Sequence, residues 1–318
     1  MKLQTVCILG GSGFVGRHLA EVLVRRGLDV RIPTRRRERA KEHLILLPTV
    51  ELIQADLHDA QALRRLVTGC DAVINLVGVL HDKRGNGFAR NHVELPAKVV
   101  AACREAGVPR IVHMSALGAD ANGPSAYLRS KHQGEEAIRK ASAHGIDVTI
   151  FRPSVIFGPG DSFLSLFAGL ARLAPVLPLG GASARFQPVF VEDVVRVFAD
   201  SLAMPATFGQ AYELCGPREY TLRELVTYVC DVIGVSRPVV PLPAPLAYLQ
   251  ALTLEMLPGS LMTRDNLASM SRPNVCSCPF PAEFGFAPTP LESVAPAYLA
   301  DTGTRARLDR FRGRAGRA

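Results

Sequence analysis

The sequence predicts an α/β protein in which a Rossmann-type doubly wound parallel sheet is followed by a smaller C-terminal substrate lobe. Up to about residue 158, short apolar strands alternate with helical runs, as in parallel βαβ units. A glycine-rich turn follows the first strand and opens the first helix. The chain has 318 residues, of which 48% are hydrophobic. This content is enough for a substantial core.

The first strand and turn predict a dinucleotide site. Thr5-Val-Cys-Ile-Leu9 is typical of a buried parallel strand, and Gly10-Gly-Ser-Gly13-Phe-Val-Gly16 follows it. Gly10 allows a tight turn, Gly13 lets the backbone approach a pyrophosphate, and Gly16 lets the helix pack on the strand. The helix N-terminus then faces the phosphates. The cofactor contacts expected here are Gly10, Ser12, Gly13, Phe14, Val15 and Gly16.

The second strand, at about residues 29–33, indicates which dinucleotide is bound. An NAD site usually has an acid after this strand to hold the ribose hydroxyls. Here the sequence continues as Thr34-Arg35-Arg36-Arg37. Guanidinium groups bind a 2′-phosphate, each charge-assisted bond contributing roughly 1.5–3 kcal/mol. We therefore expect NADP(H) rather than NAD(H), with Thr34 and Arg35 as primary contacts and Arg36 beside them. The alternative is a solvated basic turn.

Three further strands end in candidate site residues. Residues 50–57 form a strand that delivers Asp56 and Leu57, and Asp56 either holds the adenine amino group or caps the helix that begins at Ala60. Residues 72–78 end in Leu76, Val77 and Gly78, which we expect against the cofactor ribose. Residues 110–115 bring Met114 and Ser115 to the carboxyl edge of the sheet, where such folds bind ligands. Ser115 either orients a substrate carbonyl or is a turn residue.

Tyr127 and Lys131 lie four residues apart within Ser125-Ala-Tyr-Leu-Arg-Ser-Lys131. On a helix this spacing places both side chains on one face. A lysine ammonium beside a phenol lowers its pKa, so that the phenol can transfer a proton to or from a carbonyl oxygen. The alternative is a chance pair of surface residues.

These motifs together resemble the extended or atypical short-chain dehydrogenase/reductase superfamily. The matching residues are Gly10-x-x-Gly13-x-x-Gly16, Asp56, Asn75-Leu-Val-Gly78, Ser115, Tyr127-x-x-x-Lys131 and Phe151-Arg-Pro-Ser-Val-Ile-Phe-Gly158-Pro159. The resemblance implies that Pro153, Ser154 and Val155 line the nicotinamide side. Four stretches further resemble the dehydrogenase-like accessory subunit of respiratory complex I and its bacterial relatives. They are Tyr127-Leu-Arg-Ser-Lys131, Asp161-Ser-Phe-Leu164, Gln187-Pro-Val-Phe-Val-Glu-Asp193 and Thr263-Arg-Asp265.

The resemblance implies two main functions. The first is an NADP(H)-dependent oxidoreductase acting on a hydrophobic or quinone-related carbonyl, with Tyr127 as general acid/base. Lys131 would hold the nicotinamide ribose, and Ser115 would polarise the substrate oxygen. The second is an NADPH-stabilised accessory or assembly factor of a respiratory NADH:quinone oxidoreductase that turns over little. A nucleotide-sugar epimerase is a third alternative. It is disfavoured because Tyr127 follows Ser115 by only twelve positions, and a dehydratase is disfavoured because Ser115-Ala-Leu lacks an Asp-Glu pair.

The domain organisation follows from the change in pattern after residue 158. We expect residues 1–158 to form the dinucleotide domain, with 186–216 returning to it, and residues 159–185 and 217–300 to form the substrate lobe. In the lobe, Arg185, Arg218 and Arg264 either bind an anionic group or are surface charges. Residues 241–257 have apolar side chains at helical spacing. They either face a lipid-like ligand or pack in the core, and core packing is favoured.

The net charge of +8 bears on partners. The arginine-rich tail, residues 301–318, is expected to be disordered and either attracts anionic lipid or an acidic protein surface or is solvated padding. No nucleic-acid recognition module accompanies it. Cys276-Ser-Cys278 lacks a second ligand pair, so we expect no metal site. No apolar run is long enough to span a bilayer, and the first strand begins at residue 5. We expect a cytoplasmic protein, peripheral to the inner membrane if it contacts one.

Overall fold

The computed structural model describes residues 3–82, 85–256 and 262–300. The predicted disordered tail, residues 301–318, lies outside the described residues. The chain divides into two compact units, which are described separately. The first comprises the chain up to Pro153 together with Val191–Leu214 and Cys276–Phe286, and the second comprises Ser154–Phe190, Cys215–Val275 and the chain from Ala287.

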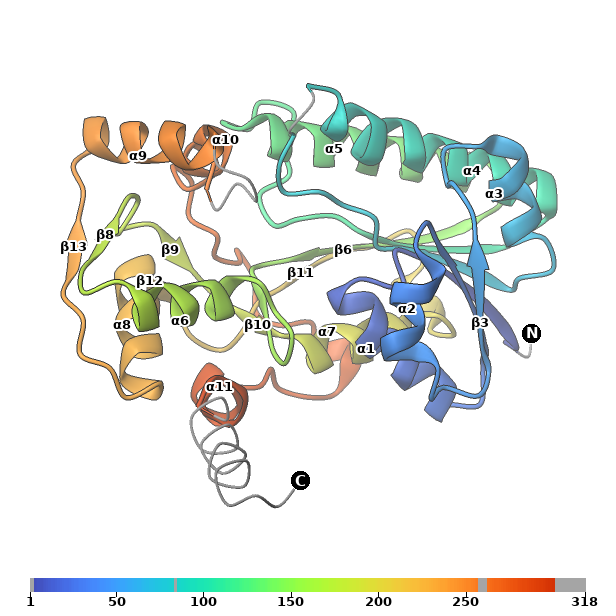
Figure 1. The fold of residues 1–318 in the computed structure, drawn as a ribbon. Coiled ribbons are helices and arrows are strands. Elements are labelled where there is room, and N and C mark those ends of the chain that lie inside the picture. Colours follow the sequence, from blue (N-terminus) through green and yellow to red (C-terminus); the bar gives the residue numbers. More distant parts are fainter. Residues whose placement is uncertain (1–2, 83–84, 257–261, 301–318) are drawn as a thin grey trace, which may run out of the picture. The chain divides into compact units, whose positions relative to one another are not determined.

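A seven-stranded parallel sheet forms the centre of the first unit (Figure 1), in the order β11-β6-β5-β4-β1-β2-β3. Every neighbouring pair is parallel. The strands are β1 (Thr5–Leu9), β2 (Asp29–Thr34), β3 (Val50–Gln54), β4 (Ala72–Asn75), β5 (Arg110–Met114), β6 (Asp147–Pro153) and β11 (Ala211–Leu214). The predicted Rossmann-type sheet is confirmed. Of residues 186–216, which were expected to return to this domain, Ala211–Leu214 join the sheet as β11, which pairs with β6. Cys215 and Gly216 group with the second unit.

Helices cover both faces of this sheet (Figure 1). They are α1 (Phe14–Arg25), α2 (Arg37–Leu44), α3 (Ala60–Val67), α4 (Leu95–Ala106), α5 (Ala126–Arg139) and α7 (Val191–Ser201), with shorter turns η1 (Ala89–Glu94), η2 (Lys140–His144), η3 (Pro205–Thr207) and η4 (Ala282–Phe284). One core layer lies between the sheet and α3, α4 and α5. On the opposite face, α1 packs against α7. Strands covered on both sides are apolar without alternation, as in β4.

The second unit has its own hydrophobic core around Phe157, Phe186 and Val226. Its strands are β7 (Ile156–Phe157), β8 (Leu177–Leu179), β9 (Arg185–Phe186), β10 (Val189–Phe190), β12 (Tyr220–Thr221) and β13 (Val239–Pro241), which form two-stranded pairs. Its helices are α6 (Phe163–Leu173), α8 (Leu222–Val232), α9 (Ala244–Met256), α10 (Arg264–Ser269) and α11 (Leu291–Leu299). Residues 154–158 and 186–190 group with this unit, and 276–286 with the first, which differs from the expected boundaries.

Helix α9 buries small side chains, whereas the sequence analysis favoured burial of its large apolar side chains. Its buried residues are Ala247 and Ala251, whereas Leu246 and Leu249 are about half exposed and Met256 is 82% exposed. The favoured core packing of these large side chains is therefore wrong. The small alanines face inward because the helix lies close to Gly180, where a Cβ atom would meet Ala247 at 3.0 Å. Among the described residues, no helix is both long and apolar enough to cross a bilayer.

A π-helical turn, η1, precedes α4 and packs against α5. The close approach depends on Gly134 in α5, because a Cβ atom at this position would overlap the carbonyl oxygen of His92 in η1. A π-helical turn widens the helix by one residue and often marks a functional site. Here it presents the side chain of His92 toward α5.

Replacing Gly134 with alanine is expected to destabilise the protein by about 1–3 kcal/mol, because the added methyl group forces η1 and α5 apart. The matched control is Gly169→Ala in α6, where nothing lies within 4 Å of the added Cβ. That change should be neutral or stabilising by up to about 1 kcal/mol, since alanine is the better helix former. Urea denaturation measures both. Equal effects of the two substitutions would show that η1 does not approach α5 as described.

Candidate functional site

The carboxyl ends of the parallel strands bring most of the predicted site residues to one edge of the first unit. Because neighbouring strands run in the same direction, five of them end at this edge. Their last residues are Leu9, Thr34, Asn75, Met114 and Pro153. Open α/β sheets bind ligands outside this edge. Within the first unit, the residues that follow β1, β2, β4 and β5 therefore lie in one region.

The turn after β1 has the geometry of a phosphate site. Gly10 has φ of +85°, which favours glycine, and a Cβ atom on Gly16 would lie 2.5 Å from the carbonyl oxygen of Gly10. Helix α1 follows, and in this fully described segment no side chain caps it and its first turn has no acid. Its N-terminal amide groups and helix dipole are therefore available to an anion. This arrangement fits a dinucleotide pyrophosphate.

The residues after β2 are basic and open to solvent. Arg35 and Arg36 are exposed, and the amide of Arg36 donates to Oγ1 of the buried Thr34 at 3.3 Å. Within the described residues, Arg35 makes no ion pair. The arrangement is compatible with a 2′-phosphate and leaves the choice of nucleotide a prediction.

Asp56 does not cap the next helix. Its Oδ1 accepts from the amide of His58 at 3.0 Å, while Asp59 caps α3 by accepting from two amides. The capping alternative for Asp56 is therefore wrong, because the helix begins three residues too late for it. The His58 hydrogen bond, aided by the charges of Arg90 and Arg35, lowers the pKa of Asp56. A contact of Asp56 and its neighbour Leu57 with adenine stays a prediction.

The loop after β4 is held by two buried polar residues, Asn75, which belongs to the motif named above, and His113, which sequence reasoning did not single out. Oδ1 of Asn75 accepts from the amide of Val77 at 3.1 Å, and its Nδ2 lies 3.2 Å from Nδ1 of His113. Beyond it, a Cβ atom on Gly78 would lie within 4.0 Å of Nζ of Lys131. The predicted cofactor loop, Leu76 to Gly78, thus lies directly beside the predicted catalytic lysine. The asparagine at a strand end was the available signal.

Lys131 is buried at this edge, with 4% of its surface exposed. Ser125 begins α5 by accepting from the amide of Leu128, and one turn later Nζ of Lys131 donates to the carbonyl oxygen of Met114 at 2.7 Å. Burial lowers the pKa of Lys131 to about 8, although the carboxylate of Glu135 acts in the opposite direction. Helix α5 is therefore tied to the end of β5 through a lysine that titrates near neutral pH.

Glu135 is itself fully buried and paired. Arg152 on β6 donates to it from Nε at 2.8 Å and from Nη2 at 2.5 Å. A two-pronged pair of this kind fixes the direction of the carboxylate. It keeps a negative charge one helical turn from Lys131, which offsets part of the cost of burying the ammonium.

Tyr127 lies on the same helix, but its pKa differs from the expectation. Burial raises the pKa of Tyr127 to about 12, whereas the sequence analysis expected Lys131 to lower it. The expectation was wrong because the phenol is buried, and burial disfavours the charged phenolate. The ammonium of Lys131 donates to the Met114 carbonyl oxygen. At neutral pH the phenol is therefore protonated. In this state it can act as a proton donor.

Ser115 follows Met114 directly and is 4% exposed. Its amide donates to the carbonyl oxygen of Phe151 at 2.7 Å, which fixes the backbone between β5 and β6. Its hydroxyl group has no hydrogen-bond partner among the described residues. Buried hydroxyl groups without partners are uncommon in proteins. A substrate or cofactor oxygen would provide the missing partner, so the residues present fit a ligand at this position.

The second unit holds the remaining predicted residues in internal contacts. Ser154 Oγ lies 2.6 Å from Oδ1 of Asn274, and the amide of Val155 donates to the same oxygen at 3.2 Å. The three arginines proposed for an anionic group each form an ion pair instead. These pairs are Arg185 with Glu219, Arg218 with Glu292 and Arg264 with Glu255. The surface-charge alternative therefore describes them better.

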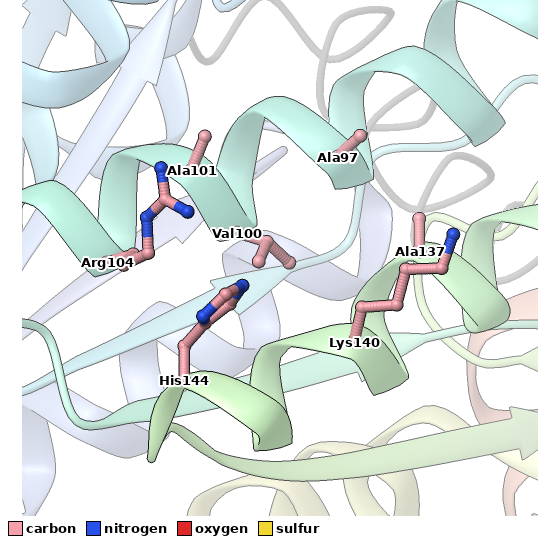
Figure 2. Close-up of a pocket in the computed structure, with 7 residues that line it drawn as sticks. All are labelled: Ala97, Val100, Ala101, Arg104, Ala137, Lys140 and His144. Atoms are coloured by element: carbon pink, nitrogen blue, oxygen red, sulfur yellow. The ribbon is translucent and has the colours of Figure 1, made fainter.

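Two surface pockets lie in the first unit. One, of about 250 Å³, is lined by Arg104, Lys140 and His144 around Ala97, Val100, Ala101 and Ala137 (Figure 2). The other, of about 350 Å³, lies beside Tyr212 and Cys278. Neither contains a predicted site residue. Across the described part of the chain, no three His, Cys, Asp or Glu side chains gather as a metal site requires.

The fold and the edge residues define an NAD(P)-binding protein of the short-chain dehydrogenase/reductase type. The family described as "NAD dependent epimerase/dehydratase family" matches residues 6–215 of the chain. The chain belongs to this family, which confirms the resemblance at the level of the extended superfamily.

Curated relatives include respiratory proteins and a lipid reductase. The chain is 32% and 34% identical to "NADH dehydrogenase [ubiquinone] 1 alpha subcomplex subunit 9, mitochondrial" of Arabidopsis thaliana and of Mus musculus, over 76% and 75% of its own length. It spans about 60% of the length of those relatives, 60% and 63% respectively. It is also 32% identical to "Ceramide reductase" of Caulobacter vibrioides, over 76% of the chain and 74% of that protein.

Solved structures share the fold at low identity. A nucleoside-diphosphate-sugar epimerase from Staphylococcus aureus aligns with a TM-score of 0.70 at 19% identity, covering 93% of this chain and 100% of that one. A dTDP-glucose 4,6-dehydratase from Streptomyces venezuelae, solved with NAD bound, aligns with a TM-score of 0.66 at 24% identity. It covers 75% of this chain and 84% of that one. At these identities the likeness concerns the fold alone.

The buried ammonium of Lys131 is expected to make stability depend on pH. Its pKa in the folded protein is about 8, below the ordinary value of 10.5, so between these pH values the unfolded chain binds more protons. Stability contributed by this group therefore rises with pH across that window, by about 1.4 kcal/mol per pH unit. Lys131→Met lacks this titrating group. We therefore expect the unfolding free energy of the wild type, relative to that of Lys131→Met, to rise with pH at about this slope. A difference that stays constant from pH 7.5 to 10 would contradict the buried ammonium.

Proposed function

We propose that the protein is an NADP(H)-dependent oxidoreductase that reduces a hydrophobic carbonyl compound, of the lipid or quinone-related class. The observation that supports this most directly is the partner-free hydroxyl group of Ser115, which adjoins the carbonyl oxygen that anchors Lys131. A buried donor without a partner at a ligand-binding edge suits a substrate oxygen.

The residues can then act in a defined order. Ser115 donates a hydrogen bond to the substrate carbonyl oxygen and polarises it. When bound, the reduced nicotinamide supplies a hydride to the carbonyl carbon. Tyr127, protonated at neutral pH, gives its proton to the oxygen on which negative charge develops. Lys131 would hold the nicotinamide ribose, and its positive charge at this edge would offset part of the negative charge that develops during the reaction.

The nucleotide would bind along the same edge. The turn Gly10 to Gly16, with Ser12, Phe14 and Val15, would hold the pyrophosphate, and Thr34, Arg35 and Arg36 would hold the 2′-phosphate. Asp56 and Leu57 would hold the adenine. Leu76, Val77, Gly78 and Met114 would lie along the ribose on the nicotinamide side, and Pro153, Ser154 and Val155 would lie near the nicotinamide ring.

The substrate class rests on two observations. A relative that covers three quarters of this chain is named a ceramide reductase, so its substrate is a membrane lipid. In the second unit, Arg185, Arg218 and Arg264, the three arginines considered for an anionic group, are paired with carboxylates. A nucleotide sugar carries two phosphates and would need unpaired cations. Both observations favour an apolar carbonyl substrate over a nucleotide-sugar epimerase reaction.

A second candidate function is that of an NADPH-stabilised accessory or assembly factor of a respiratory NADH:quinone oxidoreductase. Helix α9 favours it, because Leu246, Leu249 and Met256 expose apolar area that an isolated protein would otherwise bury. The relatives named as respiratory subunits agree with this reading. In this candidate the protein is peripheral to an anionic membrane, and the nucleotide supports the fold.

Tyr127→Phe tests catalysis. We expect kcat for NADPH oxidation, followed at 340 nm with lipid ketones and quinones, to fall by about 100-fold or more, because the proton donor is lost. NADPH affinity should change little, since the ring is retained. The matched control is Tyr212→Phe, whose hydroxyl makes only a long contact of 3.5 Å to a backbone oxygen. A wild type that retains NADPH without oxidising it, and copurifies with respiratory subunits, would support the second candidate instead.

Arg35→Asp tests the choice of nucleotide. Loss of a charge-assisted bond to the 2′-phosphate, together with the new repulsion, should weaken NADPH binding by roughly 10- to 150-fold. Binding of NADH should change little. Arg25→Asp, at the opposite end of α1, introduces the same charge change as a control. Equal losses for the two nucleotides, measured by calorimetry, would show that the phosphate site lies elsewhere.

A further inference from the structure

One buried imidazole at the site has no part in the chemistry described above. His92, in the π-helical turn η1, is 2% exposed. The amide of Val79 donates to its Nε2 at 3.0 Å, and its Nδ1 lies 2.8 Å from Oγ of Ser130. Because Nε2 accepts a hydrogen bond, the neutral ring carries its proton on Nδ1 and donates it to Ser130.

The hydroxyl group of Ser130 continues this chain. It donates to the carbonyl oxygen of Tyr127 at 2.8 Å, so its oxygen is free to accept from His92. The chain therefore has three hydrogen bonds, each with one donor and one acceptor. The Val79 amide donates to His92, His92 donates to Ser130, and Ser130 donates to the carbonyl oxygen of Tyr127. A protonated imidazole could not accept from the Val79 amide. Burial, and then the charge of Lys131, lower the pKa of His92 to about 3, while Asp82 acts in the opposite direction.

The ring of His92 also contacts the ring of Tyr127. It meets Tyr127 edge to face, with centroids 5.6 Å apart, and stacks on Phe88 at 5.4 Å. Phe88 in turn meets Tyr127 edge to face at 5.9 Å. The three rings thus contact one another pairwise. Such contacts restrict the direction in which the phenol can point.

His92 also adjoins the loop beside Lys131. A Cβ atom on Gly78 would lie 3.7 Å from Nε2 of His92 and 4.0 Å from Nζ of Lys131. Nε2 of His92 and Nζ of Lys131 therefore both lie close to Gly78. The titratable groups that act on this cluster are Tyr127, Lys131 and Glu135 of α5, His113 of β5, His92 of η1 and Asp82 before η1.

We propose that His92 is a positioning residue that fixes the loop at Gly78 and the Tyr127–Lys131 pair relative to each other. The imidazole joins the loop through Val79, α5 through Ser130, and the phenol through its ring. The assignment deepens the proposed function and rests on it, because Gly78 and Lys131 are proposed to hold the nicotinamide half of the nucleotide. Histidine suits the position because it supplies an acceptor, a donor and a flat ring at once.

The test compares His92→Phe with His92→Gln. Phenylalanine keeps a ring but loses both hydrogen bonds, whereas glutamine can accept from Val79 and donate to Ser130. Calorimetry measures the binding affinities of NADPH and of its adenosine half, adenosine 2′,5′-bisphosphate. If the wild type binds NADH instead, the pair is NADH and AMP. We expect His92→Phe to weaken binding of the whole nucleotide about tenfold, while the affinity for the half-cofactor stays unchanged. His92→Gln should recover most of the loss.

Three controls separate positioning from stability. His144→Phe, an exposed histidine of η2, should leave both affinities unchanged. Ser130→Ala should weaken binding of the whole nucleotide but not of the half-cofactor. Combining it with His92→Phe should cause no further loss of affinity, because both substitutions remove the same link. The proposal would be overturned if the affinity for the half-cofactor fell in parallel with that for the whole nucleotide. It would also be overturned if the fold-losses in affinity caused by Ser130→Ala and His92→Phe multiplied in the double variant. Either result would leave His92 a structural role.

The pH profile gives an independent readout. Lys131 has a pKa of about 8, so kcat/KM is expected to fall as pH rises through that value. His92→Phe loses the hydrogen bonds that hold α5 and the Gly78 loop in place, so the burial that lowers the pKa of Lys131 should change and this limb should move. His92→Gln should restore it. An unmoved limb would count against the proposal. A wild type that binds the nucleotide but reduces no carbonyl would contradict only the proposed reaction, and the two affinities would still decide the role of His92.

Discussion

The site depends on one interaction, the hydrogen bond between the buried ammonium of Lys131 and the carbonyl oxygen of Met114. An ammonium is costly to bury, so it persists only where acceptors and a counter-charge surround it. The bond ties the first turns of α5 to the end of β5. It thereby sets where Tyr127 and Ser115 lie along the carboxyl edge of the sheet.

The surrounding residues supply what this interaction needs. Glu135, fixed by Arg152, provides a negative charge one turn along α5. Neutral His92 and His113 add no competing charge, because burial lowers the pKa of both. The result is a lysine with a pKa of about 8 beside a phenol with a pKa of about 12. A protonated phenol beside a partly charged lysine suits donation of a proton to a substrate oxygen.

Local signals in the sequence predicted the main sheet and its edge well. Strands such as Thr5–Leu9 and the turn from Gly10 follow directly from apolar runs and glycine spacing. The contacts of Asn75 with His113 and of His92 with Ser130 could not be predicted, because each joins residues 38 positions apart along the chain. The pKa of Tyr127 was mispredicted because spacing along a helix does not tell how deeply the phenol is buried, and burial is what raises its pKa. Helix α9 was misjudged because apolar spacing marks a face without telling what covers it.

The most direct test is a crystal structure of the protein grown with NADPH. The account predicts the pyrophosphate at the N-terminus of α1, the 2′-phosphate on Arg35, and the nicotinamide ribose within hydrogen-bond distance of Lys131. It also predicts that the Met114 carbonyl oxygen and Nζ of Lys131 stay in contact. A nucleotide bound away from the carboxyl edge, or a Lys131 side chain turned out to solvent, would contradict the account.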